Sequence, residues 1–324
     1  MDGLLDVIVP VRNAASHLET FLKSVQVNSP VGCRYLIIDD GSTDQTPHVL
    51  RSAAAELTQL SVHHLPTSVG VAAARNVGLS LVNAQYLAFV DVDDWMAPGQ
   101  LEALLNGLRR TQADFVRTDF IRVDRYRRIP EQAPASLRDR CISTSDAIGD
   151  AGDRSLVDYP FLWAGMFDTT RVPFAELPFD EDLRTASDRP WFWRLHLHDL
   201  QLAVVPSPGY FYRRSSGGSS LTEQAHERLL DIIPALQRIV NLVADSPRAE
   251  HRRRAAFTAA RMVSRHISRR DRLSPQLQRR LIERGAALLS SINPQDLREA
   301  VAHARPEEAE IAMMLHAAGR RWAA

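Results

Sequence analysis

The chain has 324 residues, with 39 basic and 39 acidic side chains and a formal net charge of zero. This even balance gives no general affinity for nucleic acid, which is therefore not expected as a partner. The length leaves room for one large α/β domain and a smaller appendage. Cys33 and Cys141 match no paired or metal-binding spacing, and no stretch reaches the roughly 18 apolar residues of a membrane span. We therefore expect a cytoplasmic protein.

Apolar runs alternate with helical patterns through the first 125 residues. Residues 4–11 have the pattern of a strand buried on both faces, and a capping box at Ser16 and Glu19 opens a helix after it. Further strands are expected at 35–38, 61–65, 86–90 and 115–123, and further helices at 46–57, 70–81 and 101–108. This order predicts an α/β fold with a doubly wound, mostly parallel sheet covered by helices.

Three carboxylates, Asp91, Asp93 and Asp94, share the turn that follows the apolar run 86–90. Unpaired carboxylates this close repel one another, and burying them is costly. The cluster is therefore either a solvated polar turn or a place where a hard cation binds. Because Mg²⁺ usually takes only one or two protein carboxylates and completes its shell with substrate phosphates, this turn is a candidate metal–diphosphate site.

Polar side chains also follow two other predicted strands, at Arg12-Asn13 and at Asp39-Asp40. In open α/β sheets, ligands bind at the carboxyl ends of the strands near a topological switch point. We therefore expect these two groups and the aspartate turn to lie at one edge of the sheet, although each could be only a polar turn before a helix.

Six segments, taken together and in order, resemble the motifs of the family 2 glycosyltransferases, which have the GT-A fold. The segments are 7–13 (VIVPVRN), 38–44 (IDDGSTD), 70–78 (GVAAARNVG), 91–94 (DVDD), 179–188 (FDEDLRTASD) and 212–213 (YR) followed by Ser219 and Ser220. The likeness covers roughly residues 4–220. It implies a GT-A domain over 1–220, with a nucleotide-sugar half at 1–125 and an acceptor half at 126–220.

The resemblance implies an inverting, metal-dependent glycosyltransferase that moves a hexosyl or N-acetylhexosaminyl group from a nucleotide sugar, expected to be UDP-linked. The implied acceptor is a hydroxyl of a glycan, a lipid-linked sugar or a cell-surface polymer. Mn²⁺ or Mg²⁺ is the implied cofactor, with Asp93 as its ligand, and Asp188 is the implied catalytic base. The residues implied to contact the nucleotide are Pro10, Arg12, Asn13, Asp40, Arg75, Asp91 and Arg213. Those implied at the acceptor or diphosphate are Asp94, Trp163, Ser219 and Ser220.

Structural alternatives stand beside these roles. Arg75 could be a solvent-facing helix residue, Asp188 a helix cap, and Trp163 a core aromatic residue. Two positions also depart from the family pattern. Arg12 replaces the usual Tyr that stacks on the nucleobase, which leaves the base open even though a guanidinium can also stack. Ser187 replaces the acidic neighbour of the base.

Residues 221–324 predict a C-terminal all-helical module of four or five helices, because several helical patterns open with Pro. Its segment 248–272 is rich in arginine, with Arg254, Arg261 and Arg265 opposite an apolar face. That basic face either contacts anionic lipid or is the solvated face of a packed helix. Homo-oligomer formation through these helices and peripheral contact with the inner face of the cell membrane stay open. Residues 127–160, which contain several Pro and Gly, are expected to be an irregular loop, either mobile and near the acceptor site or only a surface excursion.

Two other function classes were considered. A non-catalytic carbohydrate-binding relative would more readily have lost Asp93 or Asp188, and both are present. The segment 90–93 (VDVD) also resembles the nucleophile strand of haloacid-dehalogenase phosphatases. Those enzymes need a basic residue downstream, whereas Lys23, the only lysine, lies upstream.

Overall fold

The computed structural model of the protein describes residues 3–125, 127–214 and 227–323. The chain folds into two compact units. Unit 1 consists of Met1–Thr144, Phe161–Asp182 and Asp199–Gly217. Unit 2 consists of Ser145–Pro160, Leu183–His198 and Gly218–Ala324. The boundary predicted after residue 220 lies outside the described residues, and unit 2 differs from the predicted helical module because it also includes two earlier segments.

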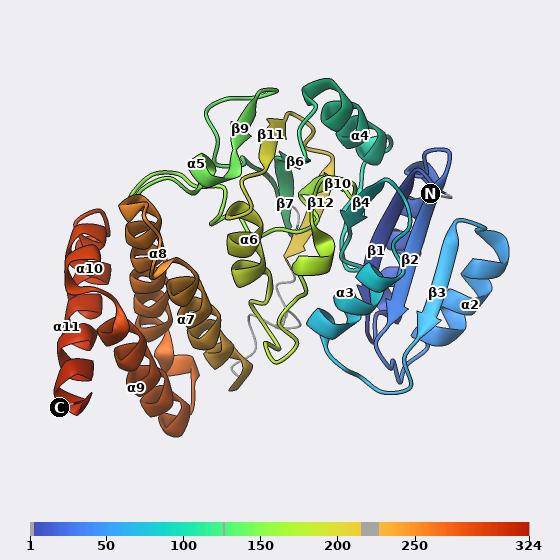
Figure 1. Ribbon diagram of the computed structural model, residues 1–324. Coiled ribbons are helices and arrows are strands. Elements are labelled where there is room, and N and C mark those ends of the chain that lie inside the picture. The colour runs from blue at the N-terminus through green and yellow to red at the C-terminus, as the bar shows by residue number, and fades with distance from the viewer. Residues whose placement is uncertain (1–2, 126, 215–226, 324) are drawn as a thin grey trace. The chain divides into compact units, whose positions relative to one another are not determined.

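An eight-stranded mixed sheet with the order β3-β2-β1-β4-β10-β6-β11-β9 forms the centre of unit 1 (Figure 1). Its strands are β1 Leu5–Val11, β2 Cys33–Asp39, β3 Leu60–His64, β4 Tyr86–Phe89, β6 Phe115–Thr118, β9 Cys141–Ser143, β10 Gly165–Asp168 and β11 Gln201–Val205. β3, β2, β1 and β4 are parallel neighbours, and so are β6 and β11. β10 is antiparallel to both of its neighbours. The strand order reverses between β1 and β4, which is where a doubly wound sheet binds ligands.

Four helices accompany the first strands: α1 Ala15–Val27, α2 Thr46–Glu56, α3 Val71–Ser80 and α4 Gln100–Thr111. The first residue of α2 holds the start of α1, since Thr46 Oγ1 accepts from the backbone N–H of Ala14 at 2.8 Å. α3 lies directly on β1: a Cβ at Gly78 would come within 2.7 Å of Ile8 Cγ2. Glycine at this position therefore lets the helix approach the sheet.

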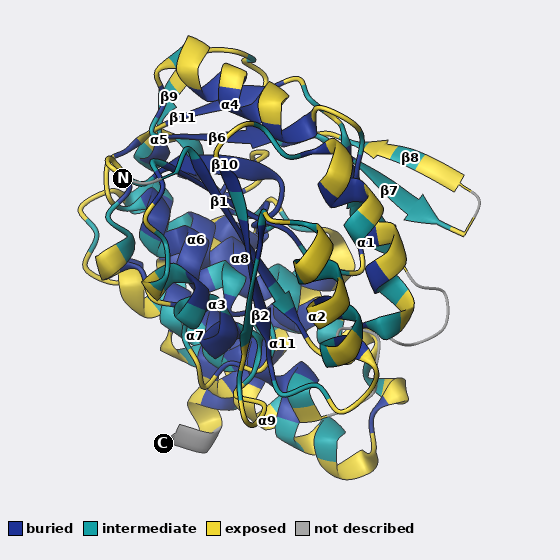
Figure 2. Cartoon of the chain, turned by 90° about the vertical axis from the view of Figure 1, so that its right-hand side faces the viewer, coloured by how far each residue is buried: buried dark blue, intermediate teal, exposed yellow. Residues whose placement is uncertain are grey.

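A second sheet in unit 1 has the order β5-β12-β7-β8. Its strands are β5 Trp95–Met96, β12 Tyr210–Arg214, β7 Phe120–Asp124 and β8 Arg127–Glu131. The single strand predicted over 115–123 is thus two strands, β6 and β7, in different sheets. The expectation of an irregular loop over 127–160 is wrong, because this segment contains β8, β9 and α5 Thr144–Ile148. Figure 2 shows that β8 carries mainly exposed residues, which is why its sequence lacks an apolar pattern.

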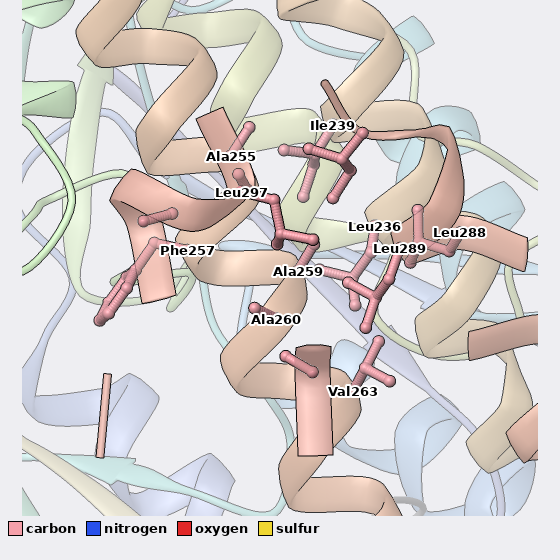
Figure 3. Packing of buried hydrophobic residues seen from close by; sticks show 14 of the residues in the cluster. Leu236, Ile239, Ala255, Phe257, Ala259, Ala260, Val263, Leu288, Leu289 and Leu297 are labelled. Atoms are coloured by element: carbon pink, nitrogen blue, oxygen red, sulfur yellow. The ribbon is translucent and has the colours of Figure 1, made fainter. Parts of the chain in front are cut away.

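Helices dominate unit 2. Their bounds are α6 Asp188–His196, α7 Ile232–Val243, α8 Ala249–Ser268, α9 Pro275–Ser291, α10 Pro294–Val301 and α11 Pro306–Ala323. The predicted proline starts are confirmed at α9 and α10, where the Ser274 and Asn293 side chains accept backbone N–H bonds as caps. Leu236, Val263 and Leu289, from three different helices, belong to its buried core (Figure 3). Among the described residues, no helix is both long and apolar enough to cross a membrane.

The basic face expected on α8 is exposed only in part, because Arg265 is exposed whereas Arg254 is buried. Arg254 is 1% exposed, and its guanidinium donates to the backbone oxygen of Asp153 at 2.7 Å and pairs with Asp158 at 3.4 Å. Arg261 reaches the same Asp158 carboxylate at 3.8 Å. Arg252 pairs with Asp296 of α10 at 3.1 Å. Acidic residues of unit 2 therefore pair with several of these arginines, and contact of the basic face with a membrane stays a prediction.

We predict that Asp158→Asn strongly destabilises unit 2. The substitution leaves the buried Arg254 charge without its counter-ion, which typically costs about 3–5 kcal/mol. Asp146→Asn is the matched control, because the Asp146–Arg248 pair is exposed and such pairs contribute about 0–1 kcal/mol. Urea unfolding followed by circular dichroism measures both variants. Equal small losses would show that Asp158 does not neutralise a buried charge.

Candidate nucleotide-sugar site

The loops after β1 and β2 meet at one edge of the sheet, as the sequence predicts. Asn13 Oδ1 accepts from the Thr43 backbone N–H at 2.8 Å, and the Asn13 backbone N–H donates to Ser42 Oγ at 2.9 Å. Asn13 adopts φ of 47°, a left-handed conformation that Asn tolerates better than most residues. Pro10 is half-buried in β1, and the adjacent Arg12 is exposed. Asn13 therefore joins the two loops, while Arg12 is accessible to a ligand.

The Asp40 carboxylate holds the loop that leads into α3. Its oxygens accept hydrogen bonds from Ser68 Oγ at 2.8 Å, from the Val69 backbone N–H at 2.6 Å and from the Gly70 backbone N–H at 3.1 Å. Asp40 is 4% exposed. An ionised carboxylate has about four lone-pair sites, so these three donors leave about one for a nucleobase N–H. Base recognition by Asp40 stays a prediction.

Tyr210 of β12 organises the aspartate turn. Its hydroxyl accepts from the Asp91 backbone N–H at 3.1 Å and donates to Asp94 Oδ2 at 2.9 Å. The other Asp94 oxygen accepts from the Arg213 backbone N–H at 2.7 Å. Asp94 is 1% exposed, and burial, followed by the charges of Asp93 and Asp91, raises its pKa well above the ordinary value. Asp94 therefore links the turn to β12, and its contact with a diphosphate or acceptor stays a prediction.

Arg75 of α3 contacts Asp91, the first aspartate of the turn. Its guanidinium pairs with Asp91 Oδ1 at 3.3 Å and lies 5.7 Å from the centre of the Phe179 ring. The Arg75 side chain is only 12% exposed, so the solvent-facing alternative is wrong. Its buried Nε has no hydrogen-bond partner in the described part of the chain.

Asp93 differs from its two acidic neighbours because its side chain is exposed. The surrounding protein, and then the charge of Asp91, raise the pKa of Asp93 to about 6, while the Arg213 guanidinium acts in the opposite direction. A cation would relieve this repulsion, so the donor set of Asp93 and the 32%-exposed Asp91 fits a hard divalent ion. The described residues contain no group of three or more acidic, His or Cys side chains that could enclose a metal alone. A cation here would therefore share its shell with substrate oxygens.

Arg213 belongs to strand β12 and packs against an aromatic side chain. Its guanidinium lies 4.9 Å from the centre of the Trp95 ring, which in turn stacks on Phe211 at 5.3 Å. A guanidinium held over an aromatic ring has restricted freedom and can still donate hydrogen bonds to a ligand. Arg213 is half-buried and therefore not an ordinary surface charge.

Trp163 is 5% exposed and belongs to an aromatic cluster in unit 1. It stacks on Tyr210 at 4.2 Å and on Tyr212 at 5.3 Å, and Phe120 meets it edge-on at 4.8 Å. This position favours the alternative that Trp163 is a core aromatic residue, whose ring packs against Tyr210. An acceptor contact by Trp163 stays a prediction.

Asp188 is the first residue of α6 and is half-buried. It belongs to unit 2, whereas the described nucleotide-contact candidates all belong to unit 1. Ser187 occupies the N-cap position, so Asp188 is not the cap of this helix. Ser219 and Ser220 lie outside the described residues.

Comparisons with known proteins agree with this geometry. Residues 6–149 match the family model described as glycosyl transferase family 2. EpsJ of Bacillus subtilis, named an uncharacterized glycosyltransferase, is 24% identical over 233 residues, which make up 71% of this chain and 66% of EpsJ, just under two thirds. The structure of S. aureus TarS in complex with UDP-GlcNAc covers 98% of this chain and 92% of that chain, with a TM-score of 0.73 and 18% identity. A mannosyltransferase from Pyrobaculum calidifontis, in complex with GDP-Man and Mn²⁺, has a TM-score of 0.56 and 14% identity, covering 98% of this chain and 88% of that one.

The fold and the site define a GT-A protein with an acidic turn at the switch point of its sheet. Residues 6–149 match glycosyltransferase family 2, the similar proteins are named glycosyltransferases, and the GT-A fold predicted from the sequence motifs is confirmed. The match with the family 2 model includes the segment 90–93 and so favours a glycosyltransferase over the phosphatase alternative.

Sequence motifs alone miss Tyr210 and Ser68. Both act through a hydroxyl that satisfies an aspartate far away in sequence, 116 residues for the Tyr210–Asp94 contact and 28 for the Ser68–Asp40 contact. No spacing rule identifies such a pair, because the contact depends on which strands become neighbours.

We predict that Tyr210→Phe destabilises unit 1 by about 1–3 kcal/mol, because it removes one hydrogen-bond partner from the buried Asp94 carboxyl and one from the Asp91 backbone. Tyr212→Phe is the control, since no described residue bonds the Tyr212 hydroxyl, and its effect should stay within about 0.5 kcal/mol. Thermal unfolding of the three proteins gives the comparison. Equal midpoints would mean that the hydroxyl of Tyr210 does not hold the turn.

Proposed function

We propose that this protein transfers a sugar from a UDP-sugar to a hydroxyl of a glycan, a lipid-linked sugar or a cell-surface polymer, with inversion at the anomeric carbon. The observation that carries the proposal is the turn after β4. It combines an exposed carboxylate, Asp93, with two largely fixed guanidinium groups, Arg75 and Arg213, within one unit. A nucleoside diphosphate and its counter-ion require this combination of opposite charges. The bound nucleotide sugars of TarS and of the mannosyltransferase lend support from similar folds.

Each residue near the turn has a chemical task in the proposed reaction. Asp93, with Asp91 beside it, would hold Mn²⁺ or Mg²⁺, which when bound supplies Lewis-acid stabilisation of the charge on the leaving diphosphate. Arg75 and Arg213 would donate hydrogen bonds to phosphate oxygens, where the planar fork of donors suits the geometry. Asn13, Arg12 and Asp40 would position the nucleoside.

The acceptor hydroxyl is a poor nucleophile until a base removes its proton. Asp188 is the proposed base. Ser187 stands in place of an acidic neighbour, so no like charge is adjacent to Asp188 in the sequence. A single displacement by the activated hydroxyl gives inversion.

Transfer should require a divalent cation and the Asp93 carboxylate. Asp93→Asn keeps the shape of the side chain but removes its charge, and we expect the rate of UDP release from UDP-sugars to fall by roughly 10²-fold or more. Glu56→Gln, an exposed carboxylate at the end of α2, is the matched control and should keep full activity. Full turnover in excess EDTA would contradict metal dependence.

UDP should bind more tightly than GDP or CMP. Asp40 has about one lone-pair site beyond its three internal hydrogen bonds, and a uracil imide N–H can donate to it. Isothermal titration of the three nucleotides under identical metal conditions gives the ranking. A preference for GDP would instead indicate that Arg12 has changed the base site.

Asp188→Asn should leave UDP binding unchanged while transfer falls by roughly 10²-fold or more, because the amide cannot accept a proton. Asp182→Asn serves as the control from the same acidic segment and should keep most of the activity. Titration calorimetry and a transfer assay separate binding from chemistry. If Asp188→Asn turns over normally while Asp180, Glu181 or Asp182 variants are inactive, the base lies in the upstream acidic run.

A further inference from the structure

His17 occupies the face of α1 that packs against β5. Two other residues of this face bond the backbone of Met96: Ser24 Oγ accepts from its N–H at 2.9 Å, and Asn28 Nδ2 donates to its carbonyl at 3.4 Å. His17 precedes Ser24 by seven residues, so the two side chains lie on one side of the helix. β5 pairs with β12, the strand that carries Arg213. The packing thus fixes α1, and with it His17, against the strand pair next to the aspartate turn.

Two buried nitrogen atoms at this place have no partner. His17 Nδ1 and Arg213 Nε are both inaccessible to solvent, and no described residue forms a hydrogen bond with either atom. The two side chains are close enough to interact electrostatically, since burial and then the Arg213 charge lower the pKa of His17. Buried polar atoms are normally satisfied, so unpartnered nitrogens on two side chains that interact electrostatically call for an explanation.

The surroundings favour an anion as the missing partner. None of the described carboxylates forms an ion pair with His17 or Arg213, although the acidic turn is close by. The Arg213 charge also acts on Asp93, where it partly opposes the rise of the pKa that burial and the Asp91 charge cause. Arg213 therefore interacts electrostatically with both the His17 imidazole and the exposed carboxylate of Asp93. An anion bound to His17 and Arg213, together with a cation bound to Asp93, would complement these side chains.

We infer that His17 is a further binding residue for the leaving nucleoside diphosphate, donating from Nδ1 to a phosphate oxygen while Arg213 donates from its guanidinium. The inference rests on the proposed function, which supplies the diphosphate. A neutral imidazole with its proton on Nδ1 is sufficient, so no charge on His17 is needed. Helix α1 thereby contributes a side chain to the phosphate site, in addition to the loops at the strand ends.

Titration calorimetry with Mg²⁺ tests this inference, using UDP, inorganic pyrophosphate and uridine as ligands. His17→Leu should weaken UDP and pyrophosphate binding by about tenfold or more, because a hydrogen bond to a charged group is lost, and should leave uridine binding unchanged. His17→Asn places an amide donor near the position of Nδ1 and should restore most of the affinity. His48→Leu, an exposed histidine of α2, is the matched control.

A His17→Leu affinity for UDP within about twofold of the native value would overturn the inference, since a lost charged hydrogen bond costs more. An equal loss for uridine would overturn it as well, because the site as a whole would then be disturbed. In the native protein, the ¹⁵N resonance of His17 Nδ1 should shift when pyrophosphate is added, which a purely structural histidine would not do. If the native protein binds pyrophosphate but not UDP, the proposed function fails while the pyrophosphate series still tests His17.

Discussion

The bond between Asp94 and strand β12 is the constraint on which the site depends. Three aspartates on one turn repel one another. The turn keeps its shape because hydrogen-bond donors of β12 satisfy the carboxyl oxygens of one of them, Asp94. The Tyr210 hydroxyl and the Arg213 backbone N–H together satisfy both Asp94 oxygens. Removing this compensation would leave a buried carboxyl group unpaired, which is among the costly defects that a fold can carry.

This arrangement divides the work among the three carboxylates. Asp94 is structural, Asp91 is paired with Arg75, and Asp93 is exposed and still repelled by Asp91. The repulsion that remains at Asp93 is what makes the turn attractive to a cation. The two arginines that flank the turn, and in our inference His17, provide the opposite charge or hydrogen-bond donors for a diphosphate. In a bound metal–diphosphate, the cation would therefore balance the carboxylates and the diphosphate would balance the arginines at this edge of the sheet.

The sequence predicts the strand ends of the first sheet because buried parallel strands have continuous apolar runs, and the motifs at those ends are local. It does not predict the burial of Arg254, since a charged side chain is almost never fully buried unless it is paired. Its partner Asp158 lies in a segment that was interpreted as an irregular loop. Tyr210 escapes prediction for a related reason, because the pairing of β12 with β5 brings together residues more than a hundred positions apart.

A crystal structure with UDP and Mn²⁺ tests the central claim most directly, with an anomalous difference map recorded at the manganese edge. The account predicts an anomalous peak at coordination distance, about 2.2 Å, from a carboxylate oxygen of Asp93, with the diphosphate of UDP completing the shell and reaching Arg213. A manganese peak away from the turn after β4, or UDP bound elsewhere on the chain, would contradict it.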